Sequence, residues 1–252
     1  MTPARRKAQR VRVQQSSHGL ELIVDETFAS FQSSGGLATR CVWDAIAAPV
    51  LALKASPAPR VLLLGYGGGS AARIVRALCP QASITGVELD PDVIKAARRH
   101  FDVQGLGVDL RQADARIFLE QAVRRCQKKP QSRYDLILED VFIGRGDAVR
   151  KPEWIPAPGH EWARRCLGRG GILVSNTLDE STRVQAALRS AFRSVLSITV
   201  EDYDNRILVA SDAPLSARGL REKLRAEPLI QESLEVLTFR TIQGVLAAGG
   251  GA

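Results

Sequence analysis

An apolar run that breaks into glycines decides the fold of this chain: Val61-Leu-Leu-Leu-Gly65-Tyr66-Gly67-Gly68-Gly69-Ser70. The run predicts a buried strand, and the glycines predict a tight loop before a helix that begins near Ser70. Glycine lets a ligand approach the backbone, and the first turn of a helix offers N–H groups without partners. Taken alone, the pattern fits either a ligand-binding loop or a tight packing of strand against helix.

The next predicted strand ends in a carboxylate, in the stretch Gly86-Val87-Glu88-Leu89-Asp90-Pro91. Glu88 therefore lies at the same sheet edge as the glycine loop, where it can accept hydrogen bonds from both hydroxyls of a ribose. The alternative is a solvated acid at a strand end. A dinucleotide site also uses an acid here, but its Gly-x-Gly-x-x-Gly pattern requires glycine where this chain has Ser70. NAD is therefore the weaker prediction.

The third and fourth strands add acids to that edge. Asp114, in Gln112-Ala113-Asp114-Ala115, can reach an adenine amino group, and it can equally cap the helix predicted over 114–126. These two roles are compatible. The fourth strand ends in Glu139 and Asp140, and strand alternation sends their side chains to opposite sides. Only one of them is expected to face a reacting centre.

From Arg60 onward, strands alternate with amphipathic helices, which predicts an α/β fold with a mostly parallel sheet. The predicted strands are 60–64, 83–88, 107–111, 134–139, 171–175, 194–200 and 205–211; the predicted helices are 69–79, 91–101, 114–126, 159–167 and 179–191. The last two strands form an antiparallel hairpin. A seven-stranded sheet closed in this way is typical of the Rossmann-like class I methyltransferase fold rather than of dinucleotide dehydrogenases.

The chain divides into three predicted parts. Residues 1–54 form a basic N-terminal arm, a small β-hairpin within 14–32 and an apolar helix over about 38–53. Residues 55–212 form the Rossmann-like domain. Residues 213–252 form two surface helices, 216–225 and 229–246, and a frayed tail over 249–252.

Composition narrows the classes of protein further. The 252 residues are 45% apolar, enough for one sizeable core. No apolar run approaches the ~20 residues that cross a bilayer, and no secretory signal core follows the basic start, so we expect a cytoplasmic protein. The net charge of +8 favours an anionic partner, but many arginines have helix-surface spacing, and nucleic-acid binding is the weaker reading. Four singly spaced cysteines predict reduced thiols and no metal site. The sequence leaves open whether the chain forms a homodimer.

Together these motifs resemble the spermidine synthase (polyamine aminopropyltransferase) family, over about 28–209. The matching stretches are 65–69, 87–90, 112–114, 138–140 and 170–174. The resemblance implies a transferase that binds S-adenosylmethionine or its decarboxylated form, with Asp140 as the catalytic base toward the acceptor. The donor-site prediction comprises Gly65, Tyr66, Gly67, Gly69, Glu88, Leu89, Asp114, Ala115 and Asp140.

The chain also departs from that family. Cys41-Val42-Trp43-Asp44 stands where polyamine synthases carry a Tyr-His-Glu cluster, and the loop after Asp140 lacks their Ser/Thr, Asp and Pro stretch. The long loop over 142–160 predicts a lid. Its Arg145, Arg150 and Lys151 either steer an anionic acceptor or only solvate the loop.

The leading hypothesis is therefore an S-adenosylmethionine-dependent methyltransferase on a spermidine synthase-like scaffold, acting on a small-molecule, anionic acceptor. The alternatives are a polyamine aminopropyltransferase that uses the decarboxylated donor, and a non-catalytic nucleoside-binding or scaffold protein. Ser175 and Asn176 close the fifth strand and can line the acceptor side. Trp43 and Trp162 are predicted to be packing residues.

Overall fold

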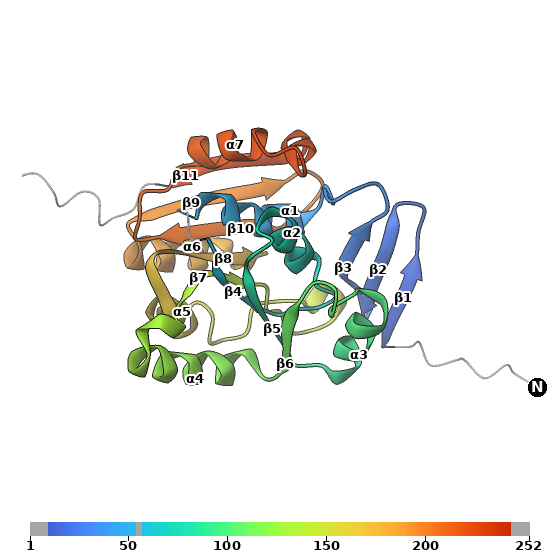
Figure 1. Cartoon of the computed structure of the whole chain (residues 1–252), viewed down its shortest axis with the longest axis horizontal. Coiled ribbons are helices and arrows are strands. Elements are labelled where there is room, and N and C mark those ends of the chain that lie inside the picture. The colour runs from blue at the N-terminus through green and yellow to red at the C-terminus, as the bar shows by residue number, and fades with distance from the viewer. Residues whose placement is uncertain (1–9, 54–56, 243–252) are drawn as a thin grey trace, which may run out of the picture.

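The computed structural model of the chain describes residues 10–53 and 57–242. Its larger sheet has the strand order β11-β9-β10-β8-β7-β4-β5-β6 (Figure 1). These strands are β4 (Arg60–Leu64), β5 (Ser83–Glu88), β6 (Val108–Gln112), β7 (Tyr134–Glu139), β8 (Leu167–Thr177), β9 (Ser194–Val200), β10 (Arg206–Ser211) and β11 (Leu237–Ile242). Neighbours from β6 to β8 pair in parallel, whereas β10 pairs antiparallel with both β8 and β9. The predicted parallel sheet with a closing hairpin is confirmed.

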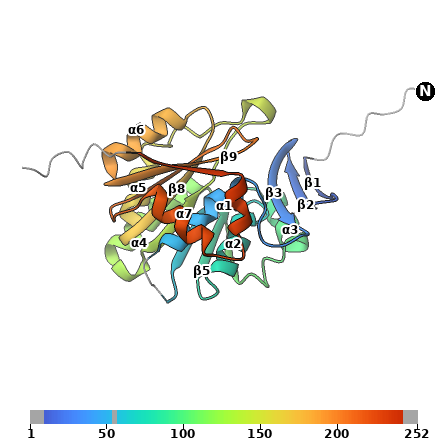
Figure 2. The same cartoon turned by 90° about the horizontal axis from the view of Figure 1, so that it is seen from above.

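Helices cover both faces of this sheet, as the view from above shows (Figure 2). They are α1 (Val42–Ala47), α2 (Ser70–Leu78), α3 (Pro91–His100), α4 (Ala115–Lys128), α5 (Gly159–Cys166), α6 (Ser181–Ala191) and α7 (Ala217–Arg225). Alternate strand residues face separate apolar cores. Val61 and Leu63 pack with α1 and α2, whereas Leu62 and Leu64 pack with α4, α5 and α6. A strand buried on both faces explains the unbroken apolar run before the glycines.

Aspartates are the N-cap residues of two helices that follow parallel strands. Asp114 accepts hydrogen bonds from the backbone N–H groups of Arg116 (2.8 Å) and Ile117 (3.2 Å). Asp90 accepts from the N–H of Asp92 at 2.9 Å. Such caps each contribute about 1 kcal/mol, and they fix where α3 and α4 start at the edge of the sheet.

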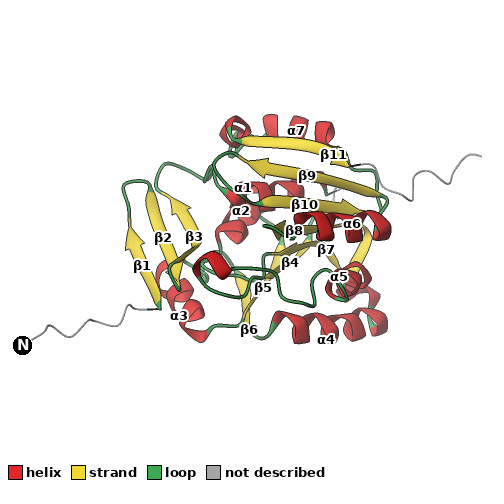
Figure 3. Ribbon diagram, turned by 180° about the vertical axis from the view of Figure 1, so that it is seen from behind, coloured by secondary structure: helices red, strands yellow, loops and turns green. Residues whose placement is uncertain are grey.

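A smaller antiparallel sheet stands beside the larger one, next to α3 (Figures 1 and 3). It consists of β1 (Val11–Gln15), β2 (Gly19–Val24) and β3 (Thr27–Ser33), so the predicted hairpin has a third strand. The helix predicted over 38–53 is shorter than expected. It begins at Val42 and changes at Ala48 into a 3₁₀ helix (Ala48–Ala52), because Pro49 lacks the N–H that would continue the α-helix.

The prediction of a second C-terminal helix over 229–246 is wrong. The described part of that segment forms a 3₁₀ helix (Gln231–Glu235) and then β11, which pairs antiparallel with β9. In Leu237-Thr238-Phe239-Arg240 apolar and polar residues alternate with the period of a strand, and an eighth strand extends the predicted seven. The basic residues of 1–9, residues 243–246 and the tail at 249–252 lie outside the described residues.

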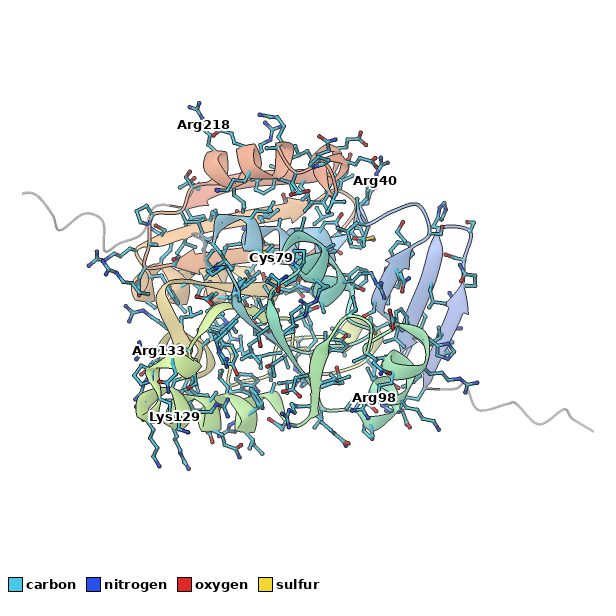
Figure 4. All side chains as sticks on the ribbon, in the orientation of Figure 1. Arg40, Cys79, Arg98, Lys129, Arg133 and Arg218 are labelled. Atoms are coloured by element: carbon cyan, nitrogen blue, oxygen red, sulfur yellow. The ribbon has the colours of Figure 1, made fainter. Side chains whose placement is uncertain are left out.

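The surface charge is spread over many elements. Figure 4 labels Arg98 on α3, Lys129 and Arg133 beyond α4, and Arg218 on α7, and these side chains lie on different sides of the molecule. Within residues 10–53 and 57–242, no helix has the length and apolar character needed to cross a membrane.

Candidate active site

A cavity of about 650 Å³ opens at the carboxyl ends of the parallel strands. Its wall is built from the strand ends, the small N-terminal sheet, α1 and the long loop after β7. The wall includes seven of the nine residues predicted for the donor: Gly65, Gly67, Glu88, Leu89, Asp114, Ala115 and Asp140. The structure does not bring Tyr66 or Gly69 to the wall.

The glycine loop owes its shape to residues with left-handed backbone, of which Gly65 and Gly67 line the cavity. Gly65 has φ +80°, and a Cβ there would collide with the carbonyl of Asp140. Gly67 has φ +56°, and its N–H donates to the Glu88 carboxylate at 2.9 Å. The loop therefore closes against β7 on one side and against β5 on the other, which leaves its backbone exposed to the cavity.

The side chain of Tyr66, which the sequence predicted to be part of the donor site, faces the core and not the cavity. Its ring is buried and packs against Gly86 and Gly69 so tightly that a Cβ at either glycine would collide with it. The hydroxyl has no hydrogen-bond partner in the described chain, and burial raises the pKa of Tyr66. Tyr66 and Gly69 thus shape the loop from behind, because the loop turns this side chain into the core shared with α2.

Glu88 holds the loop and also faces the cavity. Besides Gly67, its carboxylate accepts from the backbone N–H groups of Leu89 (2.9 Å) and Asp90 (3.1 Å). A carboxylate offers about four acceptor positions, so capacity for a ligand hydroxyl remains. Leu89 is 62% exposed beside it and presents apolar surface to the cavity.

Asp140 faces the cavity at the end of β7. Its Oδ1 accepts from Asn176 Nδ2 at 2.7 Å, and Asn176 Oδ1 accepts in turn from Asn205 Nδ2 at 2.9 Å. Asp140 Oδ2 has no partner among the described residues, which leaves it free for a ligand. Burial raises the pKa of Asp140 above its ordinary value, although the charge of Lys151 and the bond from Asn176 work against the rise.

Glu139 points away from the cavity, as strand alternation predicts. Its carboxylate is buried and accepts from Lys151 Nζ (2.6 Å), Ser175 Oγ (2.6 Å) and the Val141 N–H (2.9 Å). His160 Nε2 lies 3.6 Å from its second oxygen. Burial alone would raise the pKa of Glu139, but the charge of Lys151 and the contact with His160 outweigh it and lower the pKa to about 2. This carboxylate is a charged anchor inside the protein.

The loop after Asp140 forms a short flap over the cavity, which we define as residues 142–150. Ile143 and Arg150 exchange two backbone hydrogen bonds of 2.9 Å each, which close the flap into a hairpin. Lys151, at its base, is held by Glu139. At its tip, Arg145 Nε lies 3.3 Å from Asp25 on the small sheet. The flap is therefore fixed at both ends by ion pairs, and a lid role for the longer loop over 142–160 stays a prediction.

The cations of this loop do not reach the cavity. Lys151 is buried behind β7, Arg145 pairs with Asp25, and Arg150 is exposed and donates to the Ala148 carbonyl. None of the three lines the wall. The expectation that they steer an anionic acceptor is not supported, because tertiary ion pairs turn two of them away.

Four wall residues were missed or misjudged from the sequence. Tyr203 and Asn205 lie in the turn between β9 and β10 and reach the cavity because β10 pairs beside β8. Their turn carries no local signal of such a role. Phe28 comes from β3, and Trp43, predicted only to pack, is buried and also lines the wall. Asn176 lines the wall as expected, whereas Ser175 faces Glu139.

Comparisons with known proteins agree with this geometry. A family model described as a methyltransferase domain matches residues 61–140, the segment from the first strand to Asp140. The polyamine aminopropyltransferase of Vibrio vulnificus is 30% identical over 168 residues, which are 62% of this chain and 51% of that protein. The chain thus spans about half the length of this relative.

Two solved structures share the fold. A probable spermidine synthase from Corynebacterium glutamicum superposes with a TM-score of 0.70 at 22% identity, over 92% of this chain and 87% of that one. Human methyltransferase-like protein 13 in complex with SAH gives 0.63 at 22% identity, over 77% and 92%. The fold is the Rossmann-like fold of class I methyltransferases and spermidine synthases, and the resemblance inferred from the motifs is confirmed.

Proposed function

We propose that this chain is a transferase that moves a methyl group from S-adenosylmethionine to a small-molecule acceptor. The observation that carries the proposal is the meeting of Glu88, Asp114 and Asp140, from three different strand ends, in one cavity with the glycine loop. At about 650 Å³, this cavity has the size of ordinary ligand sites. The methyltransferase-domain match over residues 61–140 supports the same activity.

The wall fits the donor group by group. Glu88 has acceptor capacity for a ribose hydroxyl, the exposed Leu89 side chain offers an apolar surface for adenine, and Asp114 retains one carboxylate oxygen that its cap does not use. When bound, the sulfonium donor supplies an electrophilic carbon. Asp140 lies at the boundary between this half and the rest of the cavity, where its free Oδ2 can take a proton from the acceptor.

Aminopropyl transfer from the decarboxylated donor is the second candidate. The Vibrio vulnificus relative favours it, and so does the charge of the wall. Arg10 is the one cationic side chain that the described residues contribute to the wall, and it is bound to Asp90 and Asp92, so the α-carboxylate of S-adenosylmethionine meets no free cationic side chain. One observation speaks against aminopropyl transfer. Asp44, in the stretch that replaces the Tyr-His-Glu cluster, is buried and accepts hydrogen bonds from Thr39 and Ser233, so it is not available to a polyamine.

Calorimetric titration with S-adenosylmethionine and with its decarboxylated form tests the proposal. We expect S-adenosylmethionine to bind at one site per chain, and its decarboxylated form to compete for the same site. Glu88→Gln replaces one carboxylate oxygen with an NH₂ group, which cannot accept a hydrogen bond from a ribose hydroxyl or from the loop N–H groups. Because hydrogen bonds to charged groups contribute about 1.5–3 kcal/mol each, donor affinity should fall about tenfold or more. Glu161→Gln, exposed on α5, is the matched control and should bind as the wild type does. If neither donor binds, the proposal is refuted. Tighter binding of the decarboxylated donor would instead favour aminopropyl transfer.

A further inference from the structure

The half of the cavity away from Glu88 and Asp114 has a different chemistry. The sheet order places the donor groups on β4, β5 and β6, whereas β7, β8 and the β9–β10 turn contribute Asp140, Asn176, Tyr203 and Asn205. Trp43 on α1 joins this second half, because α1 packs against β8, β9 and β10. We call it the acceptor half, a name that rests on the function proposed above.

Aromatic and apolar side chains enclose the acceptor half. Phe28 stands edge-on to Trp43, with ring centroids 5.2 Å apart and an interplanar angle of 73°. Phe28 remains 38% exposed and lines the cavity, so part of its ring is open to contact with a ligand. Ile143 on the flap is also exposed, and Phe142, Trp154 and Leu178 complete this apolar lining.

One carboxylate in this half is free to meet a cation, and it is Asp140. Asp25 is paired with Arg145, and Asp44 behind Trp43 is buried and accepts from Thr39, Arg40 and Ser233. Lys151 lies behind β7 with Glu139, and its Nζ stands over the ring of Phe142, 3.9 Å from the ring centroid. The acceptor half of the described wall therefore offers a single anionic contact, and no second one for a distant charge.

We propose that the acceptor is an amine with one cationic centre on an apolar or aromatic body. Asp140 attracts the ammonium group, the exposed ring of Phe28 stabilises it through cation–π contact, and Trp43 behind that ring helps to enclose the body. A polyamine would leave its second charge without a partner. An anion would meet the charge of Asp140 without a compensating cation.

The step balances with the groups at hand. Asp140 Oδ2 takes one proton from the ammonium, which frees the nitrogen lone pair. That pair forms the N–C bond to the methyl carbon while the C–S bond breaks, and its electrons return to sulfur. The products are a methylated ammonium and neutral S-adenosylhomocysteine, and the proton on Asp140 passes to solvent.

Binding to the protein saturated with S-adenosylhomocysteine tests the inference without turnover. The probes are phenethylamine, putrescine and 3-phenylpropanoate, which are an aryl monoamine, an aliphatic diamine and an aryl carboxylate. Calorimetry should show phenethylamine binding at least tenfold more tightly than either of the others. Equal or tighter binding of putrescine or 3-phenylpropanoate would overturn the inference. Failure of S-adenosylhomocysteine itself to bind would instead contradict the proposed function.

Two phenylalanine variants locate the site. Phe28→Ala should weaken phenethylamine binding about tenfold and leave S-adenosylhomocysteine affinity unchanged, and the exposure of Phe28 makes the variant safe for folding. Phe118→Ala, on α4 with its ring beneath Arg125 and outside the cavity wall, should change neither affinity. If both variants bind phenethylamine as the wild type does, the aromatic wall is not the acceptor site.

Discussion

Glu139 and Asp140 are neighbours in the sequence, yet they lie in two opposite environments. Glu139 is buried with Lys151 and Ser175, and its pKa is lowered to about 2; Asp140 borders the cavity, and its pKa is raised. Burial acts to raise the pKa of both carboxylates, but Glu139 has Lys151 in direct contact and Asp140 does not, so the difference arises from the paired charge. One side of β7 uses an ion pair to hold the flap, and the other side keeps a carboxylate available for chemistry.

The largest expected effect separates these two roles by rate. Asp140→Asn removes the proton acceptor and preserves shape, and general-base catalysis is worth about 10² to 10⁴ in rate. We expect turnover of an amine acceptor to fall by that factor while donor affinity, measured by calorimetry, stays within threefold of the wild type.

Glu139→Gln is the matched control for this variant. Its rate per folded molecule should remain near that of the wild type, because the side chain faces away from the cavity. Near-full activity of Asp140→Asn together with inactivity of folded Glu139→Gln would exchange the two roles.

The next largest effect is on stability, on the Glu139 side. Lys151→Met leaves Glu139 buried without its cation, and breaking a buried pair from one side costs about 3–5 kcal/mol. Urea unfolding should show this loss. The double variant Lys151→Met/Glu139→Gln should recover part of it, because neither charge then remains buried. A single variant within about 1 kcal/mol of the wild type would mean that the pair does not anchor the flap.

The pH dependence of stability carries the same signature. The pKa of Glu139 lies below its ordinary value of 4.5, so the stabilisation is present above pH 4.5 and is lost as the pH falls toward 2. Lys151→Met should flatten this part of the stability curve, as measured by urea unfolding at a series of pH values. An unchanged curve would assign the acid sensitivity to other carboxylates.

The smallest effect concerns the tuning of Asp140. A base must be deprotonated, so kcat/KM should fall as the pH drops through the raised pKa of Asp140. The hydrogen bond from Asn176 stabilises the charged form and lowers that pKa. Asn176→Ala should therefore move the acidic midpoint of kcat/KM to higher pH. A midpoint that stays in place or moves to lower pH would exclude this tuning.

Local patterns predicted much of this site. Gly65, Glu88, Asp114 and Asp140 each lie at the end of a strand or within two residues of it. Parallel strands bring their carboxyl ends together, so the meeting of these residues follows from the strand order alone. Tyr66 stands in the same loop, but the loop's turn sends its ring into the core. Contacts between segments that are distant in the sequence determine the roles of Lys151, Tyr203 and Asn205. Such contacts leave no periodic pattern in the sequence. β11 was misread because its few residues of alternation follow a helix-like composition.

A crystal structure of the chain with S-adenosylhomocysteine tests the central claim most directly. We expect a ribose hydroxyl within about 3 Å of the Glu88 carboxylate, adenine against Leu89 and near Asp114, and the sulfur directed toward Asp140. A ligand seated elsewhere, or seated in the cavity with its ribose away from Glu88, would contradict that claim.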